Sequence, residues 1–141
     1  MPDLAVEIVS PDGSVFKGNA QGVQAPGVEG SFEVLYNHAP MVAAFGVGSI
    51  RVTTAAGEHF HYATSGGFLE VLDNSVIVLA ETAEPATDID MDRAQASEQR
   101  ALEHLRSAEG EAARTEAEKA LERARNRARV AMGQVGRQRT G

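Results

Sequence analysis

Few side chains in this sequence have the spacing that catalysis or metal binding requires. His59 and His61 are two residues apart, so on a strand they would share one face, as two metal ligands would. No third ligand accompanies them, and a solvated outer face is the simpler interpretation, so we predict no metal site. His38 stands in a turn just before Pro40, and neither a cysteine nor a Gly-x-Ser-x-Gly motif provides a nucleophile for it to activate. We therefore expect His38 to be a turn residue or an interface residue, and we predict no catalytic residue.

Two glycine-containing segments resemble phosphate-binding loops only superficially. Gly46–Gly48 and Gly66–Gly67 lack the strand-then-helix context of a dinucleotide loop, and the sequence has no Gly-Lys-Ser/Thr motif. Both segments are better interpreted as turns and bulges. No motif supports an enzyme.

Arginines near the C-terminal end indicate an anionic partner. Residues 119–139 contain seven bases and one acid, and Arg123 and Arg127 are one helical turn apart. They form either a solvated face balanced by nearby glutamates or a surface for an acidic protein. Nucleic acid is not expected, because residues 1–85 carry ten acids and two bases and no aromatic residues alternate with the arginines.

Composition divides the chain near residue 86. All five prolines lie at or before Pro85, whereas residues 86–141 contain 12 alanines among 56 residues. Proline marks turns and alanine favours helix, so we predict one domain over 1–86 and another over 87–141. No apolar run approaches the ~18–20 residues of a membrane span, and no signal peptide is recognised, which favours a soluble cytoplasmic protein.

The first domain is predicted to be all-β. Short apolar segments, some of them alternating with polar residues, recur at about 8–12 residue spacing, with turn signals such as Pro11–Gly13 and Asp73–Ser75 between them. These segments are 4–8, 50–54, 60–62, 68–72 and 76–79. Their spacing favours a β-sandwich or flattened barrel over a parallel sheet.

The second domain is predicted to be an antiparallel helical hairpin. Asp88 is the expected N-cap of a first helix that ends at about Arg106, and a second helix is expected from about Glu111 to Met132. Glycines beyond Met132 should fray the last turn. The apolar stripes consist mainly of alanine, which buries little area, so the hairpin should be able to open while its helices persist.

Three pairs of segments resemble the epsilon subunit family of bacterial F-type ATP synthases, which is homologous to the mitochondrial delta subunit. They are Val9–Pro11 with Val15–Gly18, Glu29–Phe32 with Asn37–Pro40, and Ser65–Val71 with Val76–Glu81. The domain boundary, before Ile89–Asp90, also falls where the family has it. Glu33 departs from the pattern, because many members have glycine there.

The resemblance implies a non-catalytic rotor subunit of the central stalk, peripheral to the cytoplasmic side of the bacterial inner membrane. Such a subunit couples proton flow to ATP synthesis, and its mobile hairpin inhibits ATP hydrolysis. The sandwich would bind the gamma subunit and the c-ring loops, and the helices would reach the beta and alpha subunits. The expected c-ring and gamma contacts are Glu29, Gly30, Ser31 and His38. The competing hypothesis is a stand-alone β-sandwich adaptor whose helical arm binds another acidic protein.

The resemblance also implies ATP as a regulatory ligand, although no cofactor is required. Some members bind ATP through an Ile/Leu-Asp-x-x-Arg-Ala motif at the start of the first helix, with further arginines whose forks suit phosphate. The alternative is that Asp90 and Arg93 merely cap and pair within the helix. The residues implied are Ile89, Asp90, Arg93, Ala94, Arg100, Arg123 and Arg127.

Overall fold

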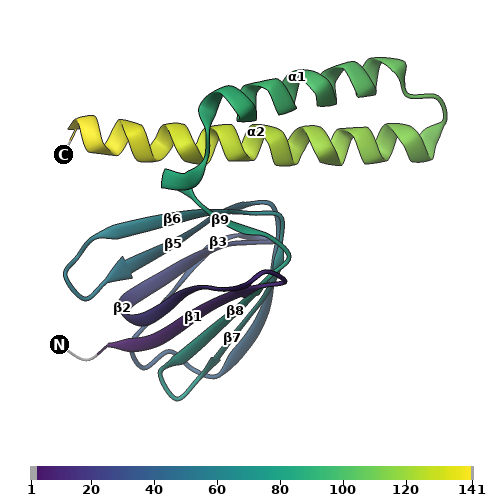
Figure 1. Ribbon diagram of the computed structural model, residues 1–141. Coiled ribbons are helices and arrows are strands. Elements are labelled where there is room, and N and C mark those ends of the chain that lie inside the picture. The colour runs from purple at the N-terminus through teal and green to yellow at the C-terminus, as the bar shows by residue number, and fades with distance from the viewer. Residues whose placement is uncertain (1–2, 141) are drawn as a thin grey trace. The chain divides into compact units, whose positions relative to one another are not determined.

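The computed structural model describes the backbone of residues 3–140 and the side chains of residues 3–133 (Figure 1). The chain forms two compact units, Met1–Pro85 and Ala86–Gly141, which divide one residue before the predicted boundary. Strands make up the first unit and helices the second, so the predicted fold class is confirmed.

Nine strands build the first unit. They are β1 (Leu4–Ser10), β2 (Gly13–Gly27), β3 (Gly30–Leu35), β4 (Met41–Phe45), β5 (Gly48–Thr54), β6 (His59–Thr64), β7 (Gly67–Leu72), β8 (Ser75–Ala80) and β9 (Ala83–Pro85). The short apolar segments of the sequence correspond to β1, β5, β6, β7 and β8. The alternation does not predict β4 or the full length of β2, because β4 is short and β2 is rich in glycine and polar residues.

The long strand β2 organises the sheet. Its first half pairs with β1 and its second half with β3 and β5, with a register shift between Ala20 and Gly22. The strand order is β1-β8-β7-β4-β2-β5-β6-β9, and the β1–β2 pairing folds this path back on itself. The β1–β8 pair is parallel and the other described pairs are antiparallel. Alternation does not predict the parallel pair, because it identifies strands but not their neighbours.

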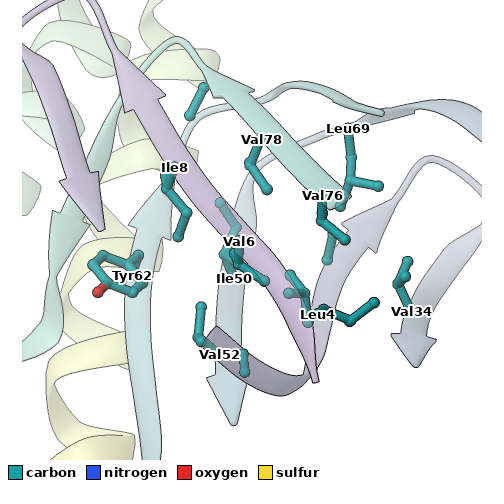
Figure 2. Close-up of a cluster of buried hydrophobic side chains, with 14 of the residues drawn as sticks. Leu4, Val6, Ile8, Val34, Ile50, Val52, Tyr62, Leu69, Val76 and Val78 are labelled. Carbon is teal, nitrogen blue, oxygen red and sulfur yellow. The ribbon is translucent and has the colours of Figure 1, made fainter. Parts of the chain in front are cut away.

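The core of the first unit consists of the inward-facing residues of these strands. Figure 2 shows Leu4 and Ile8 of β1, Ile50 of β5 and Val78 of β8 among the residues of this core, and all four are fully buried. In β8, Val76 and Val78 point into this core while Ile77 and Leu79 are exposed, as the period of two in a strand requires. Every member of this cluster lies between residues 4 and 83, so the core is complete within the first unit.

In the second unit, a short 3-10 helix η1 (Ala86–Asp88) precedes α1 (Met91–Ser107) and α2 (Glu111–Thr140). The predicted N-cap was wrong: Asp88 ends η1, and Asp90 caps α1. Asp90 has an extended backbone, and its Oδ1 accepts a hydrogen bond from the Arg93 amide at 3.2 Å.

The predicted end of α2 at Met132 was also wrong, because the helix continues to Thr140. Each of the two glycines, Gly133 and Gly136, costs only about 1 kcal/mol inside a helix, and the surrounding glutamines and arginines favour helix.

The two helices lie antiparallel, side by side, joined by the short segment 108–110 (Figure 1). Gly110 has φ 87, a left-handed conformation that favours glycine and lets the chain reverse before α2. The buried residues of the hairpin are mostly alanine, as predicted. They are Ala94 and Ala101 of α1, and Ala117, Leu121, Ala124, Asn126, Ala128, Val130 and Ala131 of α2.

Candidate functional surfaces

An exposed apolar surface covers the outer side of β4, β7 and β8. We call it the apolar outer face; its residues are between 39% and 71% exposed. Strand register places them together: Phe68 pairs with Leu79, and Glu70 lies between Val42 on β4 and Ile77 on β8. Clustered apolar side chains of this kind mark interaction surfaces. The members are Val42, Phe68, Leu72, Ile77 and Leu79.

Sequence analysis missed this face, although a signal for it exists. Val76–Leu79 is apolar at every position, so a strand with this sequence is apolar on both sides. One side fills the core, and the other side needs a partner.

A tight hairpin turn at one end of β3 carries three of the predicted contact residues. Gly27 pairs with Gly30, so Val28 and Glu29 form the tip, where Val28 is 77% exposed. Gly30 has φ 125, and a Cβ on Gly27 would lie 2.6 Å from the Gly30 carbonyl oxygen, so this turn requires glycine at both positions. Glu29, Gly30 and Ser31 are all exposed.

His38, the fourth predicted contact residue, lies beyond the opposite end of β3. Its backbone amide donates to the Leu35 carbonyl at 3.1 Å, and its Nδ1 lies 2.8 Å from the Ala39 carbonyl oxygen, which requires a proton on Nδ1. His38 is thus a turn histidine held by backbone groups. The neighbouring Asn37 amide donates to the Asn74 side chain at 2.6 Å, which ties this loop to the β7–β8 turn beside the apolar outer face.

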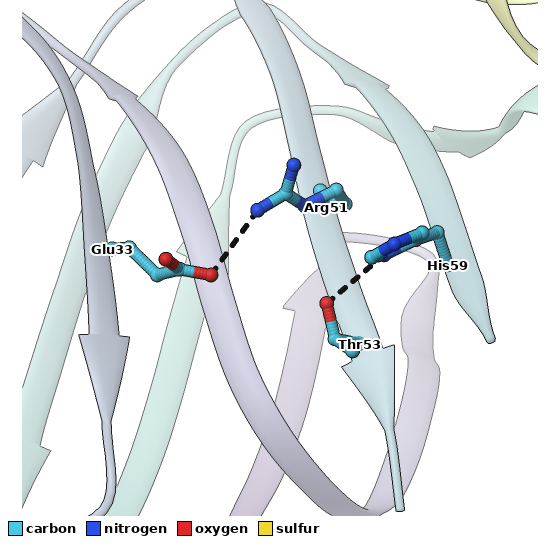
Figure 3. Close-up of polar contacts among 4 residues, drawn as sticks. All are labelled: Glu33, Arg51, Thr53 and His59. Carbon is cyan, nitrogen blue, oxygen red and sulfur yellow. Dashed lines mark hydrogen bonds and ion pairs between the residues drawn. The ribbon is translucent and has the colours of Figure 1, made fainter. Parts of the chain in front are cut away.

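The departure at Glu33 has a structural partner. Gln24 of β2 pairs with Glu33 on one side and with Arg51 on the other, and the Arg51 guanidinium reaches across to the Glu33 carboxylate at 3.1 Å (Figure 3). Gly22 leaves room for this crossing, since a Cβ there would lie 3.3 Å from the carboxylate oxygen.

The two histidines of β6 serve no described metal site. The His59 Nδ1 lies 3.0 Å from the Thr53 hydroxyl (Figure 3), and the two histidine rings are 6.4 Å apart. Within the described part of the chain, no group of three or more His, Cys, Asp or Glu side chains is arranged to hold a metal ion. Burial raises the pKa of the nearby Tyr62 hydroxyl.

The residues of the implied nucleotide site lie along both helices. Ile89 and Ala94 are buried, whereas Asp90 is occupied as the N-cap of α1. Arg93 and Arg100 are exposed on α1. On α2, Arg127 is half-buried and takes part in an interaction of its own.

A groove of about 660 Å³ lies between α1 and α2 near their connection. Alanines of both helices line it, together with Arg100, His104 and Glu116. Arg123 does not line the groove, but its guanidinium lies 3.9 Å from the carboxylate of Glu116, which does.

None of the helices in the described residues is long and apolar enough to cross a membrane.

The family models match nearly the whole chain. The ATP synthase delta/epsilon chain β-sandwich domain matches residues 3–86, and the long alpha-helix domain of the same chain matches residues 87–132. Among curated relatives, the ATP synthase epsilon chain of Salinibacter ruber is 52% identical over 95% of both chains. That of Syntrophomonas wolfei is 42% identical over 89% of this chain and 91% of its own.

Solved structures agree with these matches. A chain of the Euglena gracilis mitochondrial ATP synthase, in a structure of the OSCP/F1/c-ring part, superposes with a TM-score of 0.78 at 25% identity and covers 89% of this chain and 80% of its own. A chain from the central stalk and c-ring of the Tetrahymena thermophila enzyme shares the fold, with a TM-score of 0.63 at 13% identity over 92% and 97% of the two chains. The prediction of a non-catalytic subunit is confirmed, and the chain belongs to the delta/epsilon chain family of ATP synthases, as an epsilon subunit.

Proposed function

We propose that this epsilon subunit works as a rotor subunit of the central stalk, which couples proton flow to ATP synthesis. The apolar outer face is the observation that carries the proposal. Five apolar side chains on three adjacent strands are costly to leave in water, at about 25 cal/mol per Å². A permanent partner in the stalk removes that cost, and the gamma subunit is the partner that the family suggests.

Charged substitutions on this face test the proposal. Phe68→Asp and Leu79→Asp change exposed side chains, so the sandwich should still fold, while burial of a carboxylate against gamma should weaken binding at least tenfold. Ala56→Asp, in the exposed β5–β6 turn, is the matched control. Co-purification with gamma is the measurement. Equal recovery of gamma by parent and face variants would contradict the proposal.

The Val28–Glu29 tip is the proposed contact with the c ring. It is exposed, lies on a rigid turn and carries a carboxylate, which suits the polar loops of a ring subunit. A cysteine at Ser31 should cross-link to c-ring loops in the assembled enzyme. A cysteine at His38, at the other end of β3, should cross-link to gamma instead, because its loop adjoins the apolar outer face. Cross-linking of both positions to the catalytic head alone would refute this orientation.

The hairpin is proposed to regulate ATP hydrolysis. Its alanine-lined helices hold each other over little apolar area, so an opened form that reaches the beta and alpha subunits is energetically accessible. Peripheral attachment on the cytoplasmic side of the inner membrane would follow from assembly with the stalk.

ATP is proposed as the ligand that favours the closed hairpin. A ligand shifts such an equilibrium only by its differential affinity, and ATP at a hundredfold above its Kd would contribute about 2.7 kcal/mol. Replacing Arg123 and Arg127 by alanine should weaken ATP binding in titration calorimetry and relieve inhibition in the reconstituted complex. Unchanged binding would exclude the nucleotide role, and unchanged hydrolysis would exclude a regulatory role for these two arginines.

A further inference from the structure

An acid occupies the stripe of α1 that otherwise carries buried alanines. Ala94, Glu98 and Ala101 follow the i, i+4, i+7 spacing and therefore lie along one face of the helix. Both alanines are buried, and the Glu98 side chain is 29% exposed. A carboxylate at such a position is costly unless it is paired.

Its partner comes from the other helix. The Arg125 Nε donates to Glu98 Oε2 at 3.2 Å, next to the buried Ala124 of α2. Two further ion pairs of the hairpin, Arg114 with Glu118 at 3.7 Å and Arg123 with Glu116 at 3.9 Å, join residues within α2. Unlike these two, the Arg125–Glu98 pair bridges the helices.

The buried stripe of α2 is not uniform. It contains alanine at 117, 124, 128 and 131 and also Leu121. A slide by one turn would place either Leu121 or Arg129 where Arg125 now lies opposite Glu98, so the pair by itself does not select one register. Separation of the helices, in contrast, would remove a cation from the half-buried carboxylate. A polar pair in an alanine-lined seam can therefore favour the closed hairpin at little cost to reversibility.

We propose that the Glu98–Arg125 pair is the latch that favours the closed form of the antiparallel hairpin. Opening places both groups in water, where each is fully hydrated, so the latch holds the hairpin weakly and releases it without a large barrier. The regulatory meaning of this latch rests on the proposed function, but the latch itself belongs to the isolated chain.

The full-length isolated chain is suited to a direct test because it contains no cysteine. Gln95→Cys on α1 and Met132→Cys on α2 are exposed, neutral sites for spin labels. Pulsed electron-spin distance measurements then separate closed hairpins from open ones. The labelled residues would stand about 55 Å apart if the two helices formed one line.

Charge reversal gives the decisive comparison. Glu98→Arg alone and Arg125→Glu alone place like charges together and should each raise the open-to-closed ratio about two- to fivefold. The double reversal should return the ratio to that of the parent. Arg114→Gln with Glu118→Gln removes a pair within α2 and should leave the ratio unchanged.

Three results would overturn the latch: a parent hairpin found only in the open form, a double reversal as open as the single ones, or a control variant that opens equally. These measurements need no other subunit, so they stand even if the chain fails to bind gamma. In the reconstituted complex, the single reversals should alter inhibition of hydrolysis and the double reversal should restore it, which separates a regulatory latch from a merely structural pair.

Discussion

Glu33 shows how a departure from the family pattern is accommodated by single residues. Its carboxylate crosses β2 above Gly22 and pairs with Arg51, so the charge is neutralised on the outer side of the sheet. Because both side chains are partly exposed, at 40% and 24%, the pair contributes little net stability. Its consequence is instead a polar surface over β3, β2 and β5, in contrast to the apolar outer face.

Gly67 is the glycine that the sandwich tolerates least. A Cβ there would lie 2.0 Å from the Leu79 carbonyl oxygen and 3.0 Å from the Ala80 Cα, both backbone atoms that cannot move independently. Gly67→Ala should lower the free energy of unfolding by about 3 kcal/mol. Gly46→Ala is the control, since a Cβ there meets nothing within 4 Å, and it should change stability by less than about 0.5 kcal/mol. Chemical denaturation measures both, and equal effects would contradict the steric argument.

Tyr62 gives the sandwich a dependence on alkaline pH. Burial raises the pKa of its hydroxyl, so the folded chain keeps this proton to a higher pH than the unfolded chain does. The stability contributed is complete below the unfolded pKa of about 10 and is lost as pH rises through the folded pKa. Tyr62→Phe should remove this part of the alkaline loss in thermal unfolding.

Spectroscopy can isolate the titration of Tyr62, because the chain has only two tyrosines. In Tyr36→Phe, the ultraviolet absorbance of tyrosinate reports Tyr62 alone. A midpoint at or below the ordinary value would show that burial does not act as described.

Elements with strong periodicity could be predicted from the sequence, and those defined by their neighbours could not. The alternating residues of β1 and β5 and the alanine-rich helices specify their own conformation. The parallel β1–β8 pair, the bend of β2 and the Arg51–Glu33 contact depend on which strands lie side by side, which local pattern does not encode. Of the candidate contacts, the Glu29–Ser31 turn is implied by the family resemblance, whereas the apolar outer face can be recognised only when the strand register brings β4, β7 and β8 together.

The start of α1 allows capping to be separated from ligand binding. Asp90 accepts from the Arg93 amide, so Asp90→Ala should destabilise the first turn by about 1 kcal/mol and speed hydrogen exchange of its amides. Asp90→Ser keeps a capping oxygen and should keep the exchange rates close to those of the parent. If Asp90 also contacts ATP, the serine variant will lose nucleotide affinity while its helix stays intact. Equal exchange in the alanine and parent chains would contradict the capping role.

At the scale of the whole molecule, the two units have different physical characters. The first has a continuous aliphatic core, and the backbone of β8 packs so closely against Gly67 that no side chain fits there. Such packing makes a rigid unit. The second relies on alanine contacts and a few ion pairs, which suits a part that changes its conformation. Charge follows the same division. Residues 1–85 contain ten acids and two bases, a net charge of −8, whereas residues 86–141 contain ten acids and eleven bases, a net charge of +1.

This division predicts that the sandwich folds and functions without the hairpin. A chain ended at Thr87 keeps every residue of the core cluster, so it should unfold cooperatively with heat and should still bind gamma through the apolar outer face. It should support proton-coupled synthesis in the reconstituted complex, because the proposed gamma and c-ring contacts all precede residue 80. It should not inhibit ATP hydrolysis, since the proposed regulatory element is gone.

Phe68→Asp in the same shortened chain is the control: it should fold equally well yet fail to bind gamma. Loss of cooperative unfolding in the shortened chain would show that the hairpin is part of the sandwich's fold, and retained inhibition would move the regulatory element into the first unit.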